Sequence, residues 1–194
     1  MQPATTTRGS MLTVTESPTP EQLQVWWDAM QGDDLSVAYT DAFPPTLAAF
    51  RRDVAQGEKI LRLCLIDGQV AGALWLHDLL RRRDGTVSAG WVGGYFLQPY
   101  RGHLAVGLWQ VVRQHWENAG VKHIFCAVNI ANRLSQAFVT RGMRFHRVGC
   151  FRDFAFFHGQ PAALVIYTLH SADTALAWEL ATARAARQMF KVAS

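Results

Sequence analysis

The sequence is short of charge and of long apolar runs, and each shortage excludes a class of protein. Charged residues make up 18% of the 194 residues and hydrophobic residues 49%, which excludes a disordered chain and predicts a globular one. The longest basic run is Arg81-Arg82-Arg83, so the net charge of +4 does not indicate a nucleic-acid-binding tail. No apolar stretch reaches about 18 residues, so we expect no membrane span.

Cysteine is also scarce, and its placement argues against disulfides and metal sites. Cys64, Cys126 and Cys150 are odd in number, widely spaced and set in apolar runs, which predicts buried thiols in a reducing compartment. No Cys-x-x-Cys pair or His/Cys cluster has zinc-like spacing, so we expect no metal. No basic-then-apolar signal pattern opens the sequence. We therefore expect a cytoplasmic protein with no nucleic-acid or membrane partner.

The length predicts one domain with added segments at its ends. We expect a disordered tail over 1–10, a folded domain over 11–170, and a helical extension over 171–194 that contains a helix at 173–190. Hydrophobic periodicity and turn residues predict seven strands. They lie at 11–16, 59–66, 69–77, 87–97, 121–128, 145–157 and 162–169. The other predicted helices lie at 21–30, 44–56, 102–118 and 129–141. In the helix at 102–118 one apolar face is predicted, made of Leu104, Leu108, Val111, Val112, His115 and Ala119. In the segment at 129–141 we expect Leu134, Ala137 and Phe138 to face inward.

This order of elements predicts an α/β (α+β) mixed fold. A central twisted mixed sheet of about six to seven strands would be flanked by helices, with the C-terminal helix as an addition. The strand at 87–97, the helix at 102–118 and the strand at 121–128 form one β-α-β unit, which predicts a parallel, right-handed crossover.

The most informative stretch is Leu97-Gln98-Pro99-Tyr100-Arg101-Gly102-His103-Leu104-Ala105-Val106-Gly107. A strand-like run meets a turn there, and an amphipathic helix follows at once. Such a junction presents unpaired backbone N–H groups and the positive end of a helix dipole, which suit a phosphate or diphosphate. Arg101 and His103 can add side-chain donors. An ordinary strand-to-helix turn is the alternative.

That stretch and a second one, Asn132-Arg133-Leu134-Ser135-Gln136-Ala137-Phe138-Val139-Thr140-Arg141-Gly142-Met143, resemble the GNAT family of acetyl-CoA-dependent N-acyltransferases. The first resembles the family's Pro-x-Tyr-Arg-Gly-x-Gly-x-Gly pyrophosphate loop and helix. The second resembles its Asn-x-x-Ala/Ser…Tyr…Gly-Phe segment. The order of strands and helices agrees with the family, so the resemblance implies an acyl-CoA N-acyltransferase-like fold.

The resemblance also implies roles for individual residues. The backbone of Phe96 and Leu97 would hydrogen-bond the pantetheine arm, and a strand N–H near Leu97 would polarise the thioester carbonyl. Asn132 would contact the pantetheine or adenosine side of the cofactor. Arg101 would contribute its charge. The diphosphate would be held by the N–H groups of Gly102, His103, Leu104, Ala105, Val106 and Gly107.

Three departures from the family pattern bear on activity. Leu104 and Val106 stand where the family has small residues that let the backbone approach the phosphates. Phe138 stands where many members have a Tyr that protonates the leaving thiolate. The strand at 87–97 has no carboxylate base, and its only titratable side chain is Tyr95. The catalytic residues are therefore unassigned at this point.

The resemblance implies an N-acyltransferase that moves an acetyl group from acetyl-CoA to an amine of a small molecule or peptide by direct attack. A non-catalytic GNAT-like module that binds CoA, or only a protein partner, is the alternative. The helix at 173–190 would either cover the core or form a homodimer interface.

Several polar residues outside the two motifs remain open as site candidates. His77 and Asp78 end a strand, and a polar loop carries Asp33, Asp34, Tyr39 and Asp41; either group can face an acceptor or lie in solvent. His146 and Asp153 share a late strand and are equally open. We expect core packing for His115, and for Trp75, Trp91 and Trp109.

Overall fold

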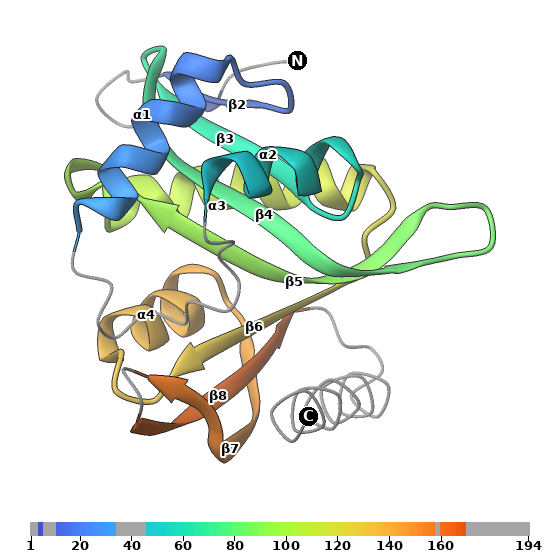
Figure 1. Ribbon diagram of the computed structural model, residues 1–194, viewed down its shortest axis with the longest axis vertical. Helices are drawn as coiled ribbons and strands as arrows, with labels where there is room; N and C mark the ends of the chain where they lie inside the picture. The colour runs from blue at the N-terminus through green and yellow to red at the C-terminus, as the bar shows by residue number, and fades with distance from the viewer. Residues whose placement is uncertain (1–3, 6–10, 34–45, 158–159, 170–194) are drawn as a thin grey trace. The chain divides into compact units, whose positions relative to one another are not determined.

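A computed structural model describes residues 4–5, 11–33, 46–157 and 160–169 (Figure 1). The chain divides into two compact units, with the division between Val121 and Lys122. The first unit contains the elements from β1 to α3, and the second those from β6 to β8. The bounds predicted for a single domain at 11–170 stay a prediction.

The first unit contains an antiparallel sheet whose strands follow one another in chain order. Its strands are β1 (Ala4–Thr5), β2 (Met11–Thr15), β3 (Ile60–Ile66), β4 (Gln69–Arg81) and β5 (Val87–Phe96). Asp67 and Gly68 join β3 to β4 with φ of 50° and 81°, the left-handed conformation of a two-residue type I′ turn. Four of the five strands were predicted.

Helices α1 (Pro20–Gln31) and α2 (Leu47–Ala55) cover one face of this sheet (Figure 1). The side chain of Thr19 accepts from the backbone of Gln22, whose own side chain accepts from the backbone of Thr19, and this capping box starts α1 where a helix was predicted. Trp26 of α1, Phe50 of α2 and Trp75 of β4 are fully buried, with ring centroids 5.4–5.7 Å apart. This aromatic cluster fixes both helices on the sheet.

The glycines of β4 and β5 make room for large side chains on the opposite strand. Gly93 pairs with Trp75, and a Cβ at Gly93 would lie 2.5 Å from the Trp75 ring. Gly94 pairs with Leu74, and Gly72 pairs with Phe96. In each pair a Cβ at the glycine would lie 2.4 Å from the partner's side chain. A side chain of the paired strand therefore occupies the space that a Cβ would need at each of these glycines.

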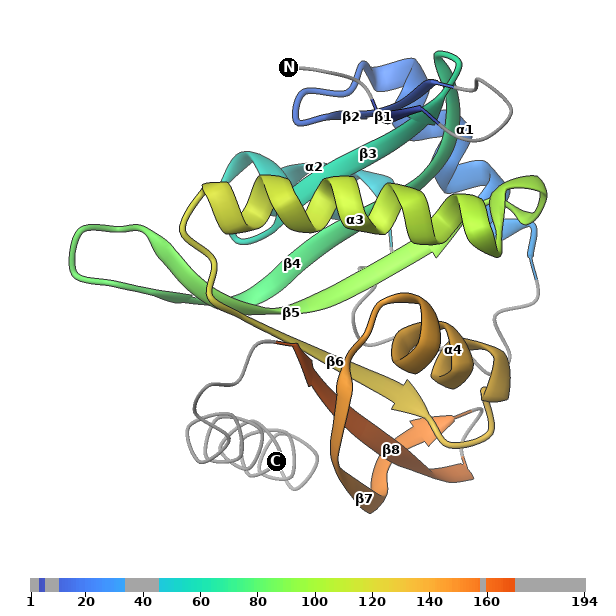
Figure 2. The same ribbon diagram turned by 180° about the vertical axis from the view of Figure 1, so that it is seen from behind.

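Helix α3 (His103–Asn118) covers the opposite face of the first unit's sheet (Figure 2). A Cβ at Gly107 would lie 2.9 Å from Leu12 of β2, so the helix approaches that strand closely. The predicted apolar stripe was wrong by part of a turn: Ala119 is exposed, and Leu104, Val111 and His115 are half-buried. The buried residues of α3 are Ala105, Leu108, Trp109, Val112 and Trp116. Burial of the two large tryptophan rings decides which face of the helix packs on the sheet.

The described residues of the second unit form three antiparallel strands and a short helix. Strand β8 (Gln160–Leu169) lies between β6 (His123–Asn129) and β7 (His146–Phe157). Helix α4 (Arg133–Ala137) continues into a π-helical turn at Phe138–Gly142. Two expectations were wrong here. Leu134, expected to face inward, is 85% exposed, and Cys150, expected to be buried, is exposed.

The ends of the chain differ in part from expectation. Ala4–Thr5 form β1 in the predicted disordered tail, because the edge of β2 offers backbone groups that can pair with an extended segment whatever its sequence. The rest of that tail lies outside the described residues, as do 170–194 with the predicted helix at 173–190. No helix among the described residues is long and apolar enough to span a membrane.

Substituting Gly93→Ala is expected to lower the free energy of unfolding by about 1–3 kcal/mol, because the new methyl group overlaps the Trp75 indole in a packed core. Denaturant unfolding measures the change. Gly32→Ala is the matched control, since Gly32 has φ of −79° and its Cβ would meet only ordinary contacts at 3.4 Å or more. A Gly93→Ala chain as stable as Gly32→Ala would contradict the packing account.

Candidate functional site

The predicted junction lies between the end of β5 and the start of α3. After Phe96 the chain makes a short 3-10 turn at Gln98–Tyr100 and reaches Gly102, the N-cap of α3, with φ of 81° and ψ of −131°. Only glycine adopts this conformation without strain. A Cβ at Gly102 would meet nothing within 4 Å, so the space beside this backbone is open.

The start of α3 presents four backbone N–H groups outside the helical ladder. The first helical bond runs from the N–H of Val106 to the carbonyl of Gly102, at 3.1 Å. The N–H groups that precede it belong to Gly102, His103, Leu104 and Ala105, and no described side chain caps this end. The predicted set was therefore too wide, because the N–H groups of Val106 and Gly107 lie within the helix ladder.

Arg101 is held by other residues of the chain. Its Nη2 forms an ion pair with Oδ2 of Asp33, and its Nε donates to the carbonyl of Phe96 at 3.0 Å. Its guanidinium lies 5.3 Å from the centroid of the Tyr95 ring, within cation–π distance. The Tyr95 hydroxyl donates to Oδ2 of Asp33 at 3.0 Å and lies 3.1 Å from the carbonyl of Ala29. The charge predicted for a phosphate is thus balanced by Asp33.

Part of the backbone at the end of β5 is already hydrogen-bonded within the sheet. The N–H of Leu97 donates to the carbonyl of Ala71 on β4, at 2.9 Å. It therefore faces β4, whereas the resemblance implied that this N–H would bind the arm of a cofactor. Because backbone groups alternate between the two edges of a strand, the N–H of Phe96 points away from β4.

Two of the residues that depart from the family pattern lie in the first turns of α3. Leu104 and Val106 are each half-buried, so part of each side chain lies against the protein. His103 is exposed in the first turn, where a side-chain donor can reach an anion in front of the helix. Their contacts with a cofactor stay predictions.

Asn132 lies in the second unit as the N-cap of α4. Its Oδ1 accepts from the N–H of Ser135 at 2.9 Å, which accounts for an Asn at this position. Its predicted contact with CoA stays a prediction.

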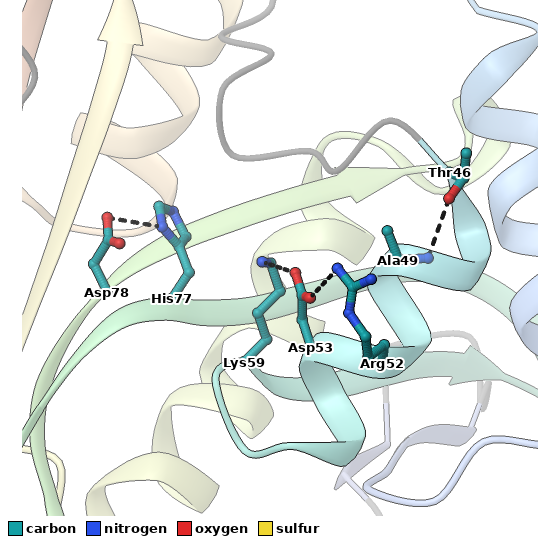
Figure 3. Close-up of polar contacts among 7 residues, drawn as sticks. All are labelled: Thr46, Ala49, Arg52, Asp53, Lys59, His77 and Asp78. Carbon is teal, nitrogen blue, oxygen red and sulfur yellow. Dashed lines mark hydrogen bonds and ion pairs between the residues drawn. The ribbon is translucent and has the colours of Figure 1, made fainter. Parts of the chain in front are cut away.

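The sequence candidates His77 and Asp78 contact each other at an irregular point of β4 (Figure 3). His77 is 8% exposed, and its Nδ1 lies 3.2 Å from Oδ2 of Asp78. Asp78 has φ of 48°, and the register between β4 and β5 shifts by one residue between His77 and Leu80. Bulges of this kind are frequent next to active sites.

The remaining candidates divide into three groups. Asp34, Tyr39 and Asp41 lie outside the described residues, and so does the side chain of Asp153. His146 is exposed on β7. Nδ1 of His115 lies 3.8 Å from Glu16, whereas Trp75 and Trp109 are core residues as expected, and Trp91 is buried as well.

The pKa values of Tyr95 and Cys64 are both raised above their ordinary values. Burial raises the pKa of Tyr95, and its hydrogen bond to the Asp33 carboxylate raises it further. Burial also raises the pKa of the Cys64 thiol, so neither group is ionised near neutral pH. No group of three or more His, Cys, Asp or Glu side chains among the described residues forms a metal site.

Sequence reasoning missed the contact of Asp33 with Arg101. The two residues are 68 positions apart, and no motif links them. The polar run after α1 drew attention to Asp33 as a member of a loop, but only the fold brings it to the end of β5.

No protein-family model matches the chain, and no curated protein matches its sequence. Solved structures do match. Ribosomal L7/L12 α-N-protein acetyltransferase RimL in complex with CoA is 13% identical, with a TM-score of 0.63, covering 82% of this chain and 93% of that one. RimJ of Mycobacterium smegmatis with CoA-disulfide is 15% identical, with a TM-score of 0.62, and 82% and 81% of the two chains are covered.

The microcin C7 self-immunity acetyltransferase MccE, in complex with acetyl-CoA and AMP, is 12% identical. Its TM-score is 0.63, and the match covers 82% of this chain and 92% of that one. These similarities confirm the predicted acyl-CoA N-acyltransferase-like fold, and the resemblance to the GNAT family is confirmed in fold.

The Arg101–Asp33 contact predicts coupled effects on stability. Asp33→Asn and Arg101→Gln are each expected to lower the melting temperature, Arg101→Gln more, because it also loses the bond to Phe96. The double variant should be less destabilised than the sum of the two, with a coupling of about 0.5–1 kcal/mol. Additive losses in a double-mutant cycle of thermal unfolding would show that the two side chains act independently.

Proposed function

We propose that this chain is an N-acetyltransferase that takes its acetyl group from acetyl-CoA. The observation that carries the proposal is the start of α3, where four N–H groups converge beside the left-handed Gly102. A helix N-terminus of this kind favours a diphosphate through both its donors and its dipole. The GNAT-like fold supports the same assignment.

The chain's residues fit the diphosphate and arm of CoA. The N–H groups of residues 102–105 would hold the diphosphate, and the exposed His103 would add a donor. Asp33 is the acidic group described at the junction, and Arg101 neutralises it, so it does not repel a diphosphate. Arg101 therefore supports the cofactor indirectly, by holding the carbonyl of Phe96 and by balancing Asp33.

The end of β5 at Phe96 would bind the pantetheine arm. The N–H of Phe96 points away from β4 there. An amine would attack the thioester carbonyl directly, and strand N–H groups would stabilise the oxyanion. Leu97 does not take part, because its N–H is bonded to Ala71.

A non-catalytic module that binds CoA or a protein partner remains the alternative. The observation that favours it is Phe138, which stands in the π-helical turn where the family pattern has Tyr. Loss of such acid–base assistance lowers rates by about 10²–10⁴-fold, whereas positioning acts independently. Acetyl transfer in a panel of amines separates the two, because a binding module gives no turnover.

The proposal extends to the acceptor, the location and the assembly. The acceptor is an amine of a small molecule or peptide; RimL and the matching enzyme from Salmonella typhimurium are described as acting on ribosomal protein L7/L12. We place the chain in the cytoplasm, acting without nucleic acid or membrane, and assign homodimer formation to the terminal segment.

Acetyl-CoA is expected to raise the melting temperature of the chain. At about 100 times its Kd a ligand adds roughly 2.7 kcal/mol of stability, which differential scanning fluorimetry detects readily. Gly102→Ala should lower this effect, because a Cβ disfavours the positive φ that directs the N–H groups.

Gly68→Ala is the matched control for that variant. Gly68 also has φ of 81° and open space around its Cβ, but it lies in the β3–β4 turn. Both variants should lose similar stability, and only Gly102→Ala should lose affinity for acetyl-CoA. An unaltered chain that shows no shift with millimolar acetyl-CoA would contradict the proposed function.

A further inference from the structure

We propose that His77 is the general base of the transfer reaction and that Asp78 orients it. This inference rests on the proposed function and assigns the base that β5 itself lacks. It draws on the His–Asp pair, on the face of the sheet that the pair occupies, and on its position along β5.

The pair has the geometry of an oriented base. A carboxylate has no proton to donate near neutral pH, so the Nδ1–H of His77 donates to Oδ2 of Asp78 at 3.2 Å. This assigns the neutral ring the tautomer in which Nε2 is the proton acceptor. His77 is 8% exposed while Asp78 is 59% exposed at its side chain, so the carboxylate contacts solvent and the ring is sheltered.

The backbone of β4 at His77 and Asp78 departs from regular strand geometry. Asp78 adopts φ of 48°, which is uncommon outside glycine, and the bulge places two residues of β4 opposite one of β5. Gly90 lies at the bulge, where a Cβ would come within 3.1–3.3 Å of Leu79, His77 and Leu76. The glycine allows β5 to pass close to the bulge that carries the pair.

The face of the sheet is also informative. His77 pairs directly with Trp91 of β5, so both side chains lie on one face. Trp75, two residues earlier on β4, shares this face and contacts Trp26 and Phe50 of α1 and α2. The imidazole therefore lies on the side of the sheet opposite α3.

His77 lies part of the way along β5 from the turn that would bind the diphosphate. Trp91 precedes Phe96 by five residues, and at about 3.3 Å per residue this places His77 about 17 Å along the strand from the end that leads to the diphosphate-binding turn. The proposal therefore places the thioester of bound acetyl-CoA in this neighbourhood, with the pantetheine arm running from the turn toward His77.

The chemistry at that point is balanced within the two substrates. The neutral amine nitrogen forms a bond to the carbonyl carbon and gives a proton to Nε2 of His77. The C–S bond breaks, and the departing thiolate takes that proton from the imidazolium. The products are the amide and CoA with its thiol protonated, and no other reactant is needed.

Among the described residues, the charged group that precedes the strand next to His77 is paired with a carboxylate. Lys59 immediately precedes β3, whose first residue pairs with Leu76, and its Nζ forms an ion pair with Asp53 of α2 at 2.7 Å (Figure 3). On the β5 side the neighbour is the uncharged Trp91. Asp78 is thus the carboxylate in contact with the imidazole, and it favours the protonated ring.

The position of His77 is tested by NMR of the histidine rings, which needs no acceptor. The His77 signal is assigned by its loss in His77→Gln. Acetyl-CoA should shift this signal, whereas 3′-phosphoadenosine 5′-diphosphate, which lacks the arm, should leave it in place. A His77 signal that both ligands leave unchanged while they bind would overturn the inference. Absence of acetyl-CoA binding to the unaltered chain would remove the proposed function itself.

The role of His77 is tested by the pH dependence of acetyl transfer to primary amines and to peptides with a free α-amino group. His77→Gln should lower kcat by about 10²–10⁴-fold, abolish the acidic limb of the kcat/KM profile and leave the KM for acetyl-CoA unchanged. Asp78→Asn should move that limb to lower pH, because the imidazolium loses its carboxylate partner.

His115→Gln is the control, because His115 lies near a carboxylate, Glu16, but in a different part of the first unit. Its pH profile should equal that of the unaltered chain. A retained thermal shift with acetyl-CoA shows that His77→Gln is folded. A His77→Gln chain that binds acetyl-CoA and keeps its kcat and its acidic limb would exclude His77 as the base.

Discussion

The uncapped start of α3 is the constraint on which the rest of the proposed site depends. Gly102 takes a conformation that other residues disfavour, and the four N–H groups around it have no capping side chain among the described residues. N–H groups at a helix start favour an anion through their donors and the helix dipole, so the junction suits a diphosphate. The neighbouring contacts of Arg101 with Phe96 and Asp33 hold this turn on the end of β5.

Strands β4 and β5 carry both the residues that fix their packing and the residues of the proposed site, at different positions along the strands. Glycines of β4 and β5 receive Trp75, Leu74 and Phe96, which fixes how closely these strands pack. At one end of β5 lies the turn that suits a diphosphate, and near the other lies the bulge with His77 and Asp78. In the proposed reaction the cofactor would extend from the turn toward this bulge, so that His77 on β4 would supply the base that β5 lacks.

Much of the fold could be predicted from local sequence. The helix at 21–30, the short connection between the strands at 59–66 and 69–77, and the turn after the strand at 87–97 each depend on residues close together in the sequence, so local patterns predicted them. The stripe of α3 was not, because Trp109 and Trp116 are buried by tertiary packing that periodicity alone does not fix. Leu134 was misplaced for a related reason, since α4 is too short for its pattern to define a face.

The candidate site was predicted in outline and corrected in detail. The motif located the turn, but the engaged N–H of Leu97 and the ion pair of Arg101 depend on β4 and on α1, which only the fold brings near. His77 and Asp78 are adjacent in the sequence, but the sequence did not show how they are placed. The bulge, the positive φ of Asp78 and the pairing of His77 with Trp91 are the structural features on which their proposed role depends.

The most direct measurement is an amide NMR titration of the chain with CoA and, separately, with pantetheine, which lacks the diphosphate. The account predicts that CoA shifts the amide signals of Gly102, His103, Leu104 and Ala105 most strongly, and that pantetheine leaves them nearly unchanged. Bound CoA that leaves these four signals unaffected would contradict the assignment of this helix start as the diphosphate site.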